Sequence, residues 1–190
     1  MSGPRLWATT PGTITGPGRP DTPATTGGLI TGKEPVGMEY RSTDGAGVGA
    51  WVWRKRPDGW MPTEMWTGWR SLKNSWVLAD GTPWEGLALF VARSAQLLHF
   101  RIYDYLATSP GQQGQLRGIS WEWMPSSSGL TLPAAQMTGM PPLRADLMPH
   151  VGNNSGTMQF PFTANSHYRS EIAVVPRSLK APTTLLGDPA

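Results

Sequence analysis

A tryptophan-rich stretch punctuated by glycine, residues 37–70, constrains the fold of this chain more than any other segment. Residues 40–43 and 51–54 have the aromatic and β-branched composition of strands, and the glycine-rich residues 44–49 between them suit a hairpin loop longer than two residues. A second turn signal, the Pro-Asp-Gly of residues 57–59, leads into a further strand. The pattern predicts a short β-meander.

Aromatic side chains must supply most of the buried surface of this unit, because aliphatic residues are scarce in it. Each buried ring removes roughly 150–250 Å² from water, which can hold together a module of about 35 residues. The predicted module core consists of Tyr40, Trp51, Trp53, Trp60 and Trp69. The same rings would form a sugar-stacking platform if they were exposed, so a structural core and a sugar-binding surface both stay open.

The motifs of residues 37–70 resemble a small module of tail fibres and minor tail proteins of tailed bacteriophages, best matched in phages of actinobacteria. The shared pattern is a Tyr-x-Ser/Thr-Thr strand, a Gly-rich link, a Trp-x-Trp-x-Lys strand, a Gly-Trp turn and a closing Thr-Gly-Trp-Arg. One departure is visible: Met65 and Trp66 precede Thr67, where the family usually has Asp, so we expect a different turn there. The resemblance implies a homotrimeric component of a virion tail, and it brings no active site.

The rest of the chain is predicted to be all-β. Gly 23 and Pro 19 make up about a fifth of the 190 residues, which indicates many turns and argues against long helices. Residues 76–175 hold roughly five to seven short strand-like segments, which favours a β-sandwich, jelly-roll-like domain. The predicted parts are an extended Pro/Gly-rich N-terminal arm (1–35), a Trp-rich β-meander (36–72), a β-sandwich head (75–178) and a C-terminal tail (179–190).

The clearest element of the predicted head is a hairpin. Residues 86–93 and 97–106 flank a short polar connection, and Leu98, Phe100 and Ile102 alternate toward one face. We also predict strands at residues 116–123, with Ile119, Trp121 and Trp123 on one face, and at residues 157–162 and 170–175. Residues 125–149 are expected to be loops, with a turn at 146–149, and Pro161 is expected to mark an edge strand or to end its ladder.

On its own the N-terminal segment is expected to be extended and mobile, and the C-terminal tail is expected to be partly mobile. Residues 9–33 alternate Pro, Gly and Thr, and they bury too little apolar surface to offset their own ordering entropy. Their few apolar anchors suit either an arm that docks on neighbouring tail proteins or an ordinary flexible linker. The tail from Pro176 onward has a similar composition.

Composition and charge disfavour several functions. A net charge of +3 with a basic cluster only at residues 54–56 argues against nucleic acid as a partner. The absence of cysteine excludes disulfides and thiolate metal sites. No apolar run reaches the roughly 18–20 residues needed to span a bilayer, so no membrane insertion is expected. The N-terminus lacks the apolar core of a signal peptide, so we expect synthesis in a host cytoplasm.

Catalytic and metal-binding constellations are not evident either, so no cofactor is predicted. His99, His150 and His167 stand far apart, and only His99 near a trimer axis would gather imidazoles around an ion. Asp104 and Glu122 lie on neighbouring predicted strands, as a glycosidase pair would, but pairing with Arg101 or Arg117 is the simpler interpretation. We therefore predict that the protein is not an enzyme.

Recognition remains as the predicted activity, since ten Trp in 190 residues is a high content. Such rings either bind glycans beside amide groups or fill subunit interfaces. The candidate ligand or interface residues are Trp84, Trp121, Trp123, Tyr103, Asn153 and Asn154. The predicted function is a structural component of a phage tail, located in the virion, attached through its N-terminal arm and facing a host-surface glycan. The alternatives are a non-viral carbohydrate-binding adhesion module and a tail-associated cell-wall hydrolase.

Overall fold

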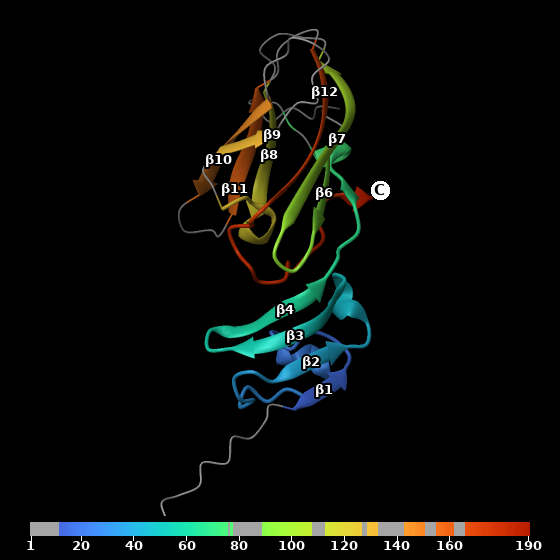
Figure 1. Cartoon of the computed structure of the whole chain (residues 1–190), viewed down its shortest axis with the longest axis vertical. Helices are drawn as coiled ribbons and strands as arrows, with labels where there is room; N and C mark the ends of the chain where they lie inside the picture. Colours follow the sequence, from blue (N-terminus) through green and yellow to red (C-terminus); the bar gives the residue numbers. More distant parts are fainter. Residues whose placement is uncertain are drawn as a thin grey trace, which may run out of the picture.

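The computed structural model describes residues 12–75, 77, 89–107, 113–126, 129–132, 143–150, 155–161 and 166–190. Figure 1 shows an elongated molecule with a lower body, made of strands β1 to β4, and an upper body, made mainly of strands β6 to β12. Helical segments in the described ranges are 3-10 turns of three or four residues. This confirms the all-β prediction. No helix in these ranges is long and apolar enough to cross a membrane.

The lower body is one four-stranded sheet in the order β1-β2-β3-β4. Strands β2 (Glu39–Ser42), β3 (Ala50–Arg56) and β4 (Gly59–Met65) form the predicted antiparallel meander. Strand β1 (Thr13–Gly16) adds a parallel fourth strand at the edge beside β2. It comes from the segment that was predicted to be an extended arm.

The described part of that arm, residues 12–35, is therefore folded against the lower sheet, contrary to the expectation of an extended chain. Its backbone is held by β1 pairing, by the bond from the Tyr40 hydroxyl to the Pro17 carbonyl, and by the Asp44 carboxylate, which accepts from the Gly18 N–H at 3.0 Å. A turn, η1 (Pro23–Thr26), then leads to the buried Ile30. These contacts offset the ordering entropy that the composition alone leaves uncompensated. Docking of the arm on other tail proteins stays a prediction.

The core of the lower body is aromatic, as expected, and three of the predicted rings are fully inside it. Tyr40, Trp53 and Trp60 are buried there, and Tyr40 meets Trp60 edge to face with ring centroids 6.2 Å apart. Ala95, from the turn between β6 and β7, and Ala181, near the C-terminus, belong to the same cluster. The lower body thus completes its core with residues contributed from beyond the meander.

One sheet of the upper body has the strand order β12-β7-β6-β5-β13. The predicted hairpin is confirmed as β6 (Leu89–Arg93) and β7 (Leu98–Ala107), which pair antiparallel. Its predicted inward face is buried, since Leu98, Phe100 and Ile102 are all at most 1% exposed. The remaining members are β12 (Ser166–Val174), β5 (Arg70–Ser71) and β13 (Asp188–Pro189).

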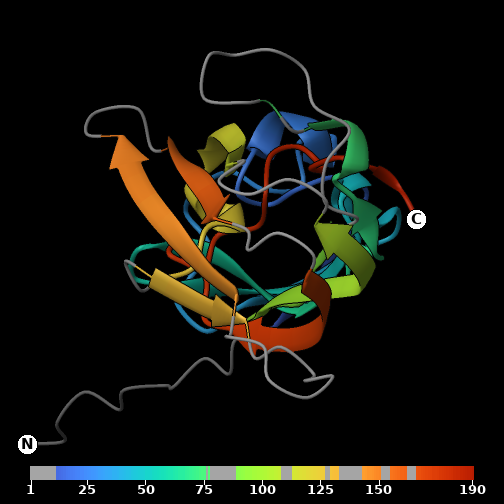
Figure 2. The same cartoon turned by 90° about the horizontal axis from the view of Figure 1, so that it is seen from above.

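The second upper sheet has the order β8-β11-β10-β9 and is antiparallel throughout. Its strands are β8 (Gln113–Ser120), β9 (Gly129–Leu132), β10 (Leu143–His150) and β11 (Ser155–Pro161). The two upper sheets lie on opposite sides of the body, as Figure 2 shows from above. The arrangement is sandwich-like, while the jelly-roll and trimer predictions stay predictions.

Two local predictions in this sheet are wrong. Residues 146–149 belong to strand β10 and do not form a turn, because β10 pairs with β11 on one side and with β9 on the other. This double ladder outweighs the turn preference of the local sequence. Residues 121–123 form a 3-10 turn, η4 (Trp121–Trp123), so the strand ends at Ser120. Pro161 does end its ladder, as the last residue of β11.

The C-terminal residues 176–190, here called the C-terminal strap, pack along both bodies, contrary to the expectation of a mobile tail. Arginine side chains donate to its backbone carbonyls at three places: Arg93 to Ser178, Arg19 to Ala181, and Arg70 to Gly187. The Trp123 indole N–H donates to the carbonyl of Thr184, and β13 closes the sheet edge beside β5. Charge-assisted bonds to carbonyls compensate for the low apolar content of the strap.

Candidate recognition site

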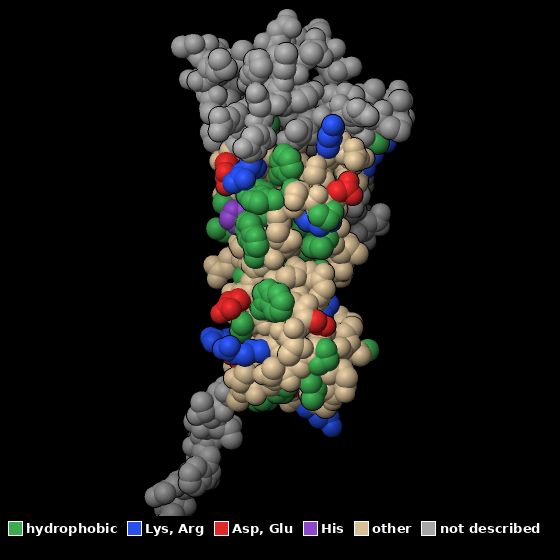
Figure 3. Space-filling model, turned by 90° about the vertical axis from the view of Figure 1, so that its right-hand side faces the viewer, with side chains coloured by type: hydrophobic (Ala, Val, Ile, Leu, Met, Phe, Trp, Pro, Cys, Tyr) green, Lys and Arg blue, Asp and Glu red, His purple; other side chains and the backbone are tan. Residues whose placement is uncertain are grey.

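Three connected hollows lie along the waist, where strand β4 and the strap meet the turn between β6 and β7. The first, of about 600 Å³, lies between Trp51, Trp66 and residues 94–97. The second, of about 540 Å³, shares residues 95–97 with the first and is also lined by two exposed apolar side chains, Val175 and, in the strap, Leu179. The third, of about 390 Å³, shares Asp58 and Lys180 with the second. Figure 3 shows one face of the molecule, on which hydrophobic and charged side chains are scattered over a surface of mostly other side chains and backbone.

The first hollow is the candidate site. We call it the Trp51–Trp66 groove, and the lining residues that matter for its chemistry are Trp51, Thr63, Glu64, Trp66, Ser94 and Gln96. Its two indoles are 48% and 44% exposed, respectively. Apolar rings of this size are normally buried, so two of them on one groove indicate a surface that meets a ligand or partner.

The exposure of Trp51 differs from the sequence prediction, which placed it in the core with Trp53. Residues two apart on a regular strand share a face, so the two rings were expected on the same side. The ladder between β3 and β4 instead shifts register between Ala50 and Val52 and again between Val52 and Trp53. These irregularities break the alternation, so that Trp53 is buried while Trp51 faces the groove.

The glycine-rich loop provides a seat for the Trp51 ring. Gly45 lies in a short 3-10 turn, η2 (Gly45–Gly47), with a φ of +63°. A Cβ atom built on Gly45 would lie 2.9 Å from the Cζ2 atom of Trp51, so the indole lies directly against this backbone. The Asp44 carboxylate fixes the loop by accepting from the Ala46 N–H at 2.9 Å and from the Ser42 hydroxyl at 2.7 Å. These bonds, that of Ser42 first, lower the pKa of Asp44.

The Trp66 ring is held by an aromatic cluster. It contacts the edge of Trp69 at a centroid distance of 5.9 Å and that of His99 at 5.3 Å, both nearly perpendicular. The Arg101 guanidinium lies 4.3 Å from the centroid of Trp69 and pairs with Glu171 at 2.8 Å. Trp69, predicted to lie in the module core, is therefore half-buried in this cluster.

Trp66 is also fixed through its backbone. Its N–H donates to the carbonyl of Gly49 at 2.8 Å, and the residue forms an isolated bridge with Ser94. Gly49 has a φ of +73°, and a Cβ there would lie 2.1 Å from the Trp66 carbonyl oxygen, so only glycine fits. Trp66 stands where the sequence departs from the phage-module pattern. Trp66 was not among the predicted site residues, and this departure from the pattern is the sequence feature that could have identified it.

Polar groups rim the groove, and Glu64 is the only charged residue among the described residues that line it. The Ser94 hydroxyl donates to the Leu97 carbonyl and lies 3.2 Å from the Nε2 atom of His99. Burial lowers the pKa of His99, against the opposing effect of Glu171, so the imidazole is neutral near pH 7. The groove thus offers two indoles, one carboxylate, and hydroxyl and amide groups.

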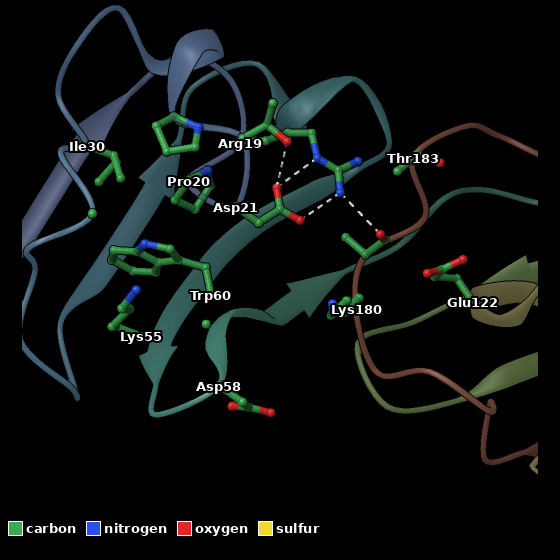
Figure 4. Close-up of a pocket in the computed structure, with 15 residues that line it drawn as sticks. Arg19, Pro20, Asp21, Ile30, Lys55, Asp58, Trp60, Glu122, Lys180 and Thr183 are labelled. Atoms are coloured by element: carbon green, nitrogen blue, oxygen red, sulfur yellow. Dashed lines mark hydrogen bonds and ion pairs between the residues drawn. The ribbon is translucent and has the colours of Figure 1, made fainter. Parts of the chain in front are cut away.

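The third hollow, shown in Figure 4, lies between strand β4, residues 19–23 and the strap. The Trp60 indole forms one wall, and its N–H has no hydrogen-bond partner among the described residues. Arg19, which points toward the strap, is paired with Asp21 at 2.8 Å. In the described lining of this hollow, the acids (Asp21, Asp58 and Glu122) equal the bases in number (Arg19, Lys55 and Lys180). It therefore has no clear preference for an anion or a cation.

The other predicted site residues are placed as follows. Trp123 is buried and bonded to the strap, so it serves the core and not a ligand. The backbones of Tyr103 and Trp121 lie in β7 and η4, and their side chains fall outside the described part of the structure. Trp84, Asn153 and Asn154 lie outside the described residues.

The structure describes only some of the side chains of the predicted acid pair, Asp104 and Glu122, and of the metal candidate, His99. The Asp104 side chain is outside the described part, and the described partner of Arg101 is Glu171. Glu122 contributes its carbonyl as an acceptor for Arg93 at 2.9 Å. His99 lies in the aromatic cluster, and among the described residues no group of three or more potential metal ligands gathers.

Comparisons with family profiles, with curated proteins and with solved structures find no match to this chain.

Proposed function

We propose that the protein is a structural, non-enzymatic component of a phage tail that contributes to host-surface recognition through the Trp51–Trp66 groove. The resemblance of residues 37–70 to a tail-protein module supports the location. The observation that carries the recognition role is the pair of half-exposed indoles, each fixed by its own packing contacts on one groove. In the tail it would act as a minor tail protein, a fibre or a baseplate-associated protein.

The lining of the groove favours binding over hydrolysis. Glycoside hydrolysis by the usual mechanisms needs two carboxyl groups that face each other across the substrate. Within the part of the chain that the structure describes, Glu64 is the single acidic residue of the groove lining. A tail-associated cell-wall hydrolase is therefore the weaker alternative. Incubation of the protein with purified host cell wall should release no soluble sugars or peptides.

A non-viral carbohydrate-binding adhesion module would use the same groove, so the two candidates differ in location and assembly. Phage particles purified from the host that carries this gene should contain the protein at the tail, detected by mass spectrometry and by immunogold labelling. Light scattering should give about three times the chain mass of 20.6 kDa. A monomer absent from purified particles would contradict the proposal and favour the adhesion module.

A further inference from the structure

We infer that the Trp51–Trp66 groove binds a neutral polysaccharide, with the apolar faces of its pyranose rings on the two indoles and its hydroxyl groups bonded to Glu64 and Gln96. This inference rests on the recognition role proposed above and names the class of ligand. Three features of the groove carry it: the two indoles are fixed, the described residues of the rim include a carboxylate and no base, and the edge strand resists pairing with a peptide.

The rings are fixed before any ligand arrives. Trp51 lies against the backbone of Gly45, and Trp66 lies against Trp69 and His99. When a ligand stacks on the two indoles, these side chains therefore lose little conformational entropy. Flat, rigid aromatic surfaces suit a ligand with a flat apolar face, such as a pyranose, a nucleobase or a proline ring.

The rim chemistry selects among these ligands. A carboxylate such as Glu64 only accepts hydrogen bonds, so its partner must be a donor. Sugar hydroxyl groups are donors, whereas proline residues lack the backbone N–H. Nucleic acid needs basic side chains along its phosphates, and the described lining of this groove contains no Lys or Arg. The saccharide is the ligand that satisfies both the rings and the rim.

The edge of the lower sheet argues against an added peptide strand. Strand β4 is the edge strand of its sheet and contributes Thr63 and Glu64 to the groove. Pro62 lies within β4, where it pairs with Trp53 in register and has no N–H to offer a ladder. Proline in an edge strand hinders pairing with another chain. A peptide ligand would therefore lack the strand pairing that an exposed sheet edge otherwise offers.

The test is affinity electrophoresis of the full chain in gels that contain one polymer each. The neutral probes are mannan, arabinogalactan, dextran and laminarin, and the comparison probes are hyaluronan, oligo(dT) and a decaproline peptide measured by calorimetry. We expect retardation by at least one neutral polysaccharide. Trp51→Ala and Trp66→Ala should each weaken that affinity about tenfold or more, and Glu64→Gln should weaken it severalfold. The control Val36→Ala removes an exposed apolar side chain outside the groove lining and should leave the affinity unchanged.

Three outcomes would overturn the inference: no retardation by any neutral polysaccharide, equal retardation of wild type and Trp51→Ala, or binding only to oligo(dT), hyaluronan or decaproline. Glu64→Gln tests the site without altering either indole, so it remains informative if a Trp variant misfolds. Because the assay uses purified protein, failure here would leave the tail location untouched. Sugar binding by a protein that is absent from particles would overturn the tail proposal and leave this inference standing.

Discussion

The buried guanidinium of Arg93 offers the sharpest test of how the strap is held on the upper body. Its side chain is fully buried and donates to backbone carbonyls of three segments: Ser94 in the β6–β7 turn, Glu122 in η4 at 2.9 Å and Ser178 in the strap at 2.9 Å. Burial lowers its pKa to about 10, which leaves the group charged at neutral pH. Replacement by Met keeps much of the side-chain volume and removes every donor.

Two opposing terms set the size of the effect. Each carbonyl left unpaired inside the protein costs about 1–3 kcal/mol, which places the loss for three carbonyls at no more than about 9 kcal/mol. Removing the buried charge recovers several kcal/mol of desolvation. We expect Arg93→Met to lower the free energy of unfolding by about 3–5 kcal/mol, a large fraction of the roughly 5–15 kcal/mol typical of a domain.

The assay is urea denaturation followed by tryptophan fluorescence, together with limited proteolysis of the strap. Arg93→Lys keeps the charge, but an ammonium group cannot reproduce the planar set of N–H donors of a guanidinium. The free energy of unfolding of Arg93→Lys should therefore fall between the values of wild type and Arg93→Met. Arg54→Met, at an exposed position on β3, is the control and should change stability by no more than about 0.5 kcal/mol. A loss below about 1 kcal/mol for Arg93→Met, or a strap cleaved no faster than in wild type, would refute this reasoning.

The remaining predictions concern the lower body and the aromatic cluster. Trp53→Ala should cost about 3–5 kcal/mol in urea denaturation, because it empties the centre of the aromatic core; a cost below about 1 kcal/mol would contradict that role. Gly47→Ala, at φ +70° in open space, should lower the free energy of unfolding by about 1–2 kcal/mol. Gly49→Ala should lower it by about 1–3 kcal/mol more, because its Cβ would meet a backbone carbonyl. Equal losses for the two variants would argue against that close approach. Asp44→Ala should cost about 1–2 kcal/mol at pH 7 through loss of its capping bonds. Because the pKa of Asp44 is lowered, the difference from wild type should shrink as the pH falls below the ordinary carboxyl value of 3.8, and a difference that does not shrink in acid would refute the assignment. Because burial lowers the pKa of His99, the unfolded chain gains the proton first as the pH falls below about 6.5, so stability should decline there; His99→Gln should flatten that part of the profile, and an unchanged profile would contradict it.

Local pattern was sufficient where the controlling interactions are close in sequence. The turn signals around residues 44–49 and 57–59 predicted β2, β3 and β4, and strict alternation in residues 98–102 predicted the buried face of β7. The aromatic core was predicted through Tyr40, Trp53 and Trp60, since no other residues of the meander could supply enough buried area. Each of these inferences depends on spacing within a few residues of the same strand or turn.

The sequence by itself therefore determined the all-β class, the meander and the aromatic character of its core, since turn chemistry and strand periodicity are local properties. Tertiary structure decided which rings are exposed. The register shifts in β3 turned Trp51 outward, and a bridge to the distant Ser94 placed Trp66 beside it. Tertiary structure also decided that both ends of the chain pack against the folded bodies. The apolar content of these ends is too low to predict folding, and the hydrogen bonds that hold them come from residues up to 163 positions away in the sequence. Contacts between segments so far apart leave no periodic trace in the sequence, so the groove itself became visible only in the folded chain.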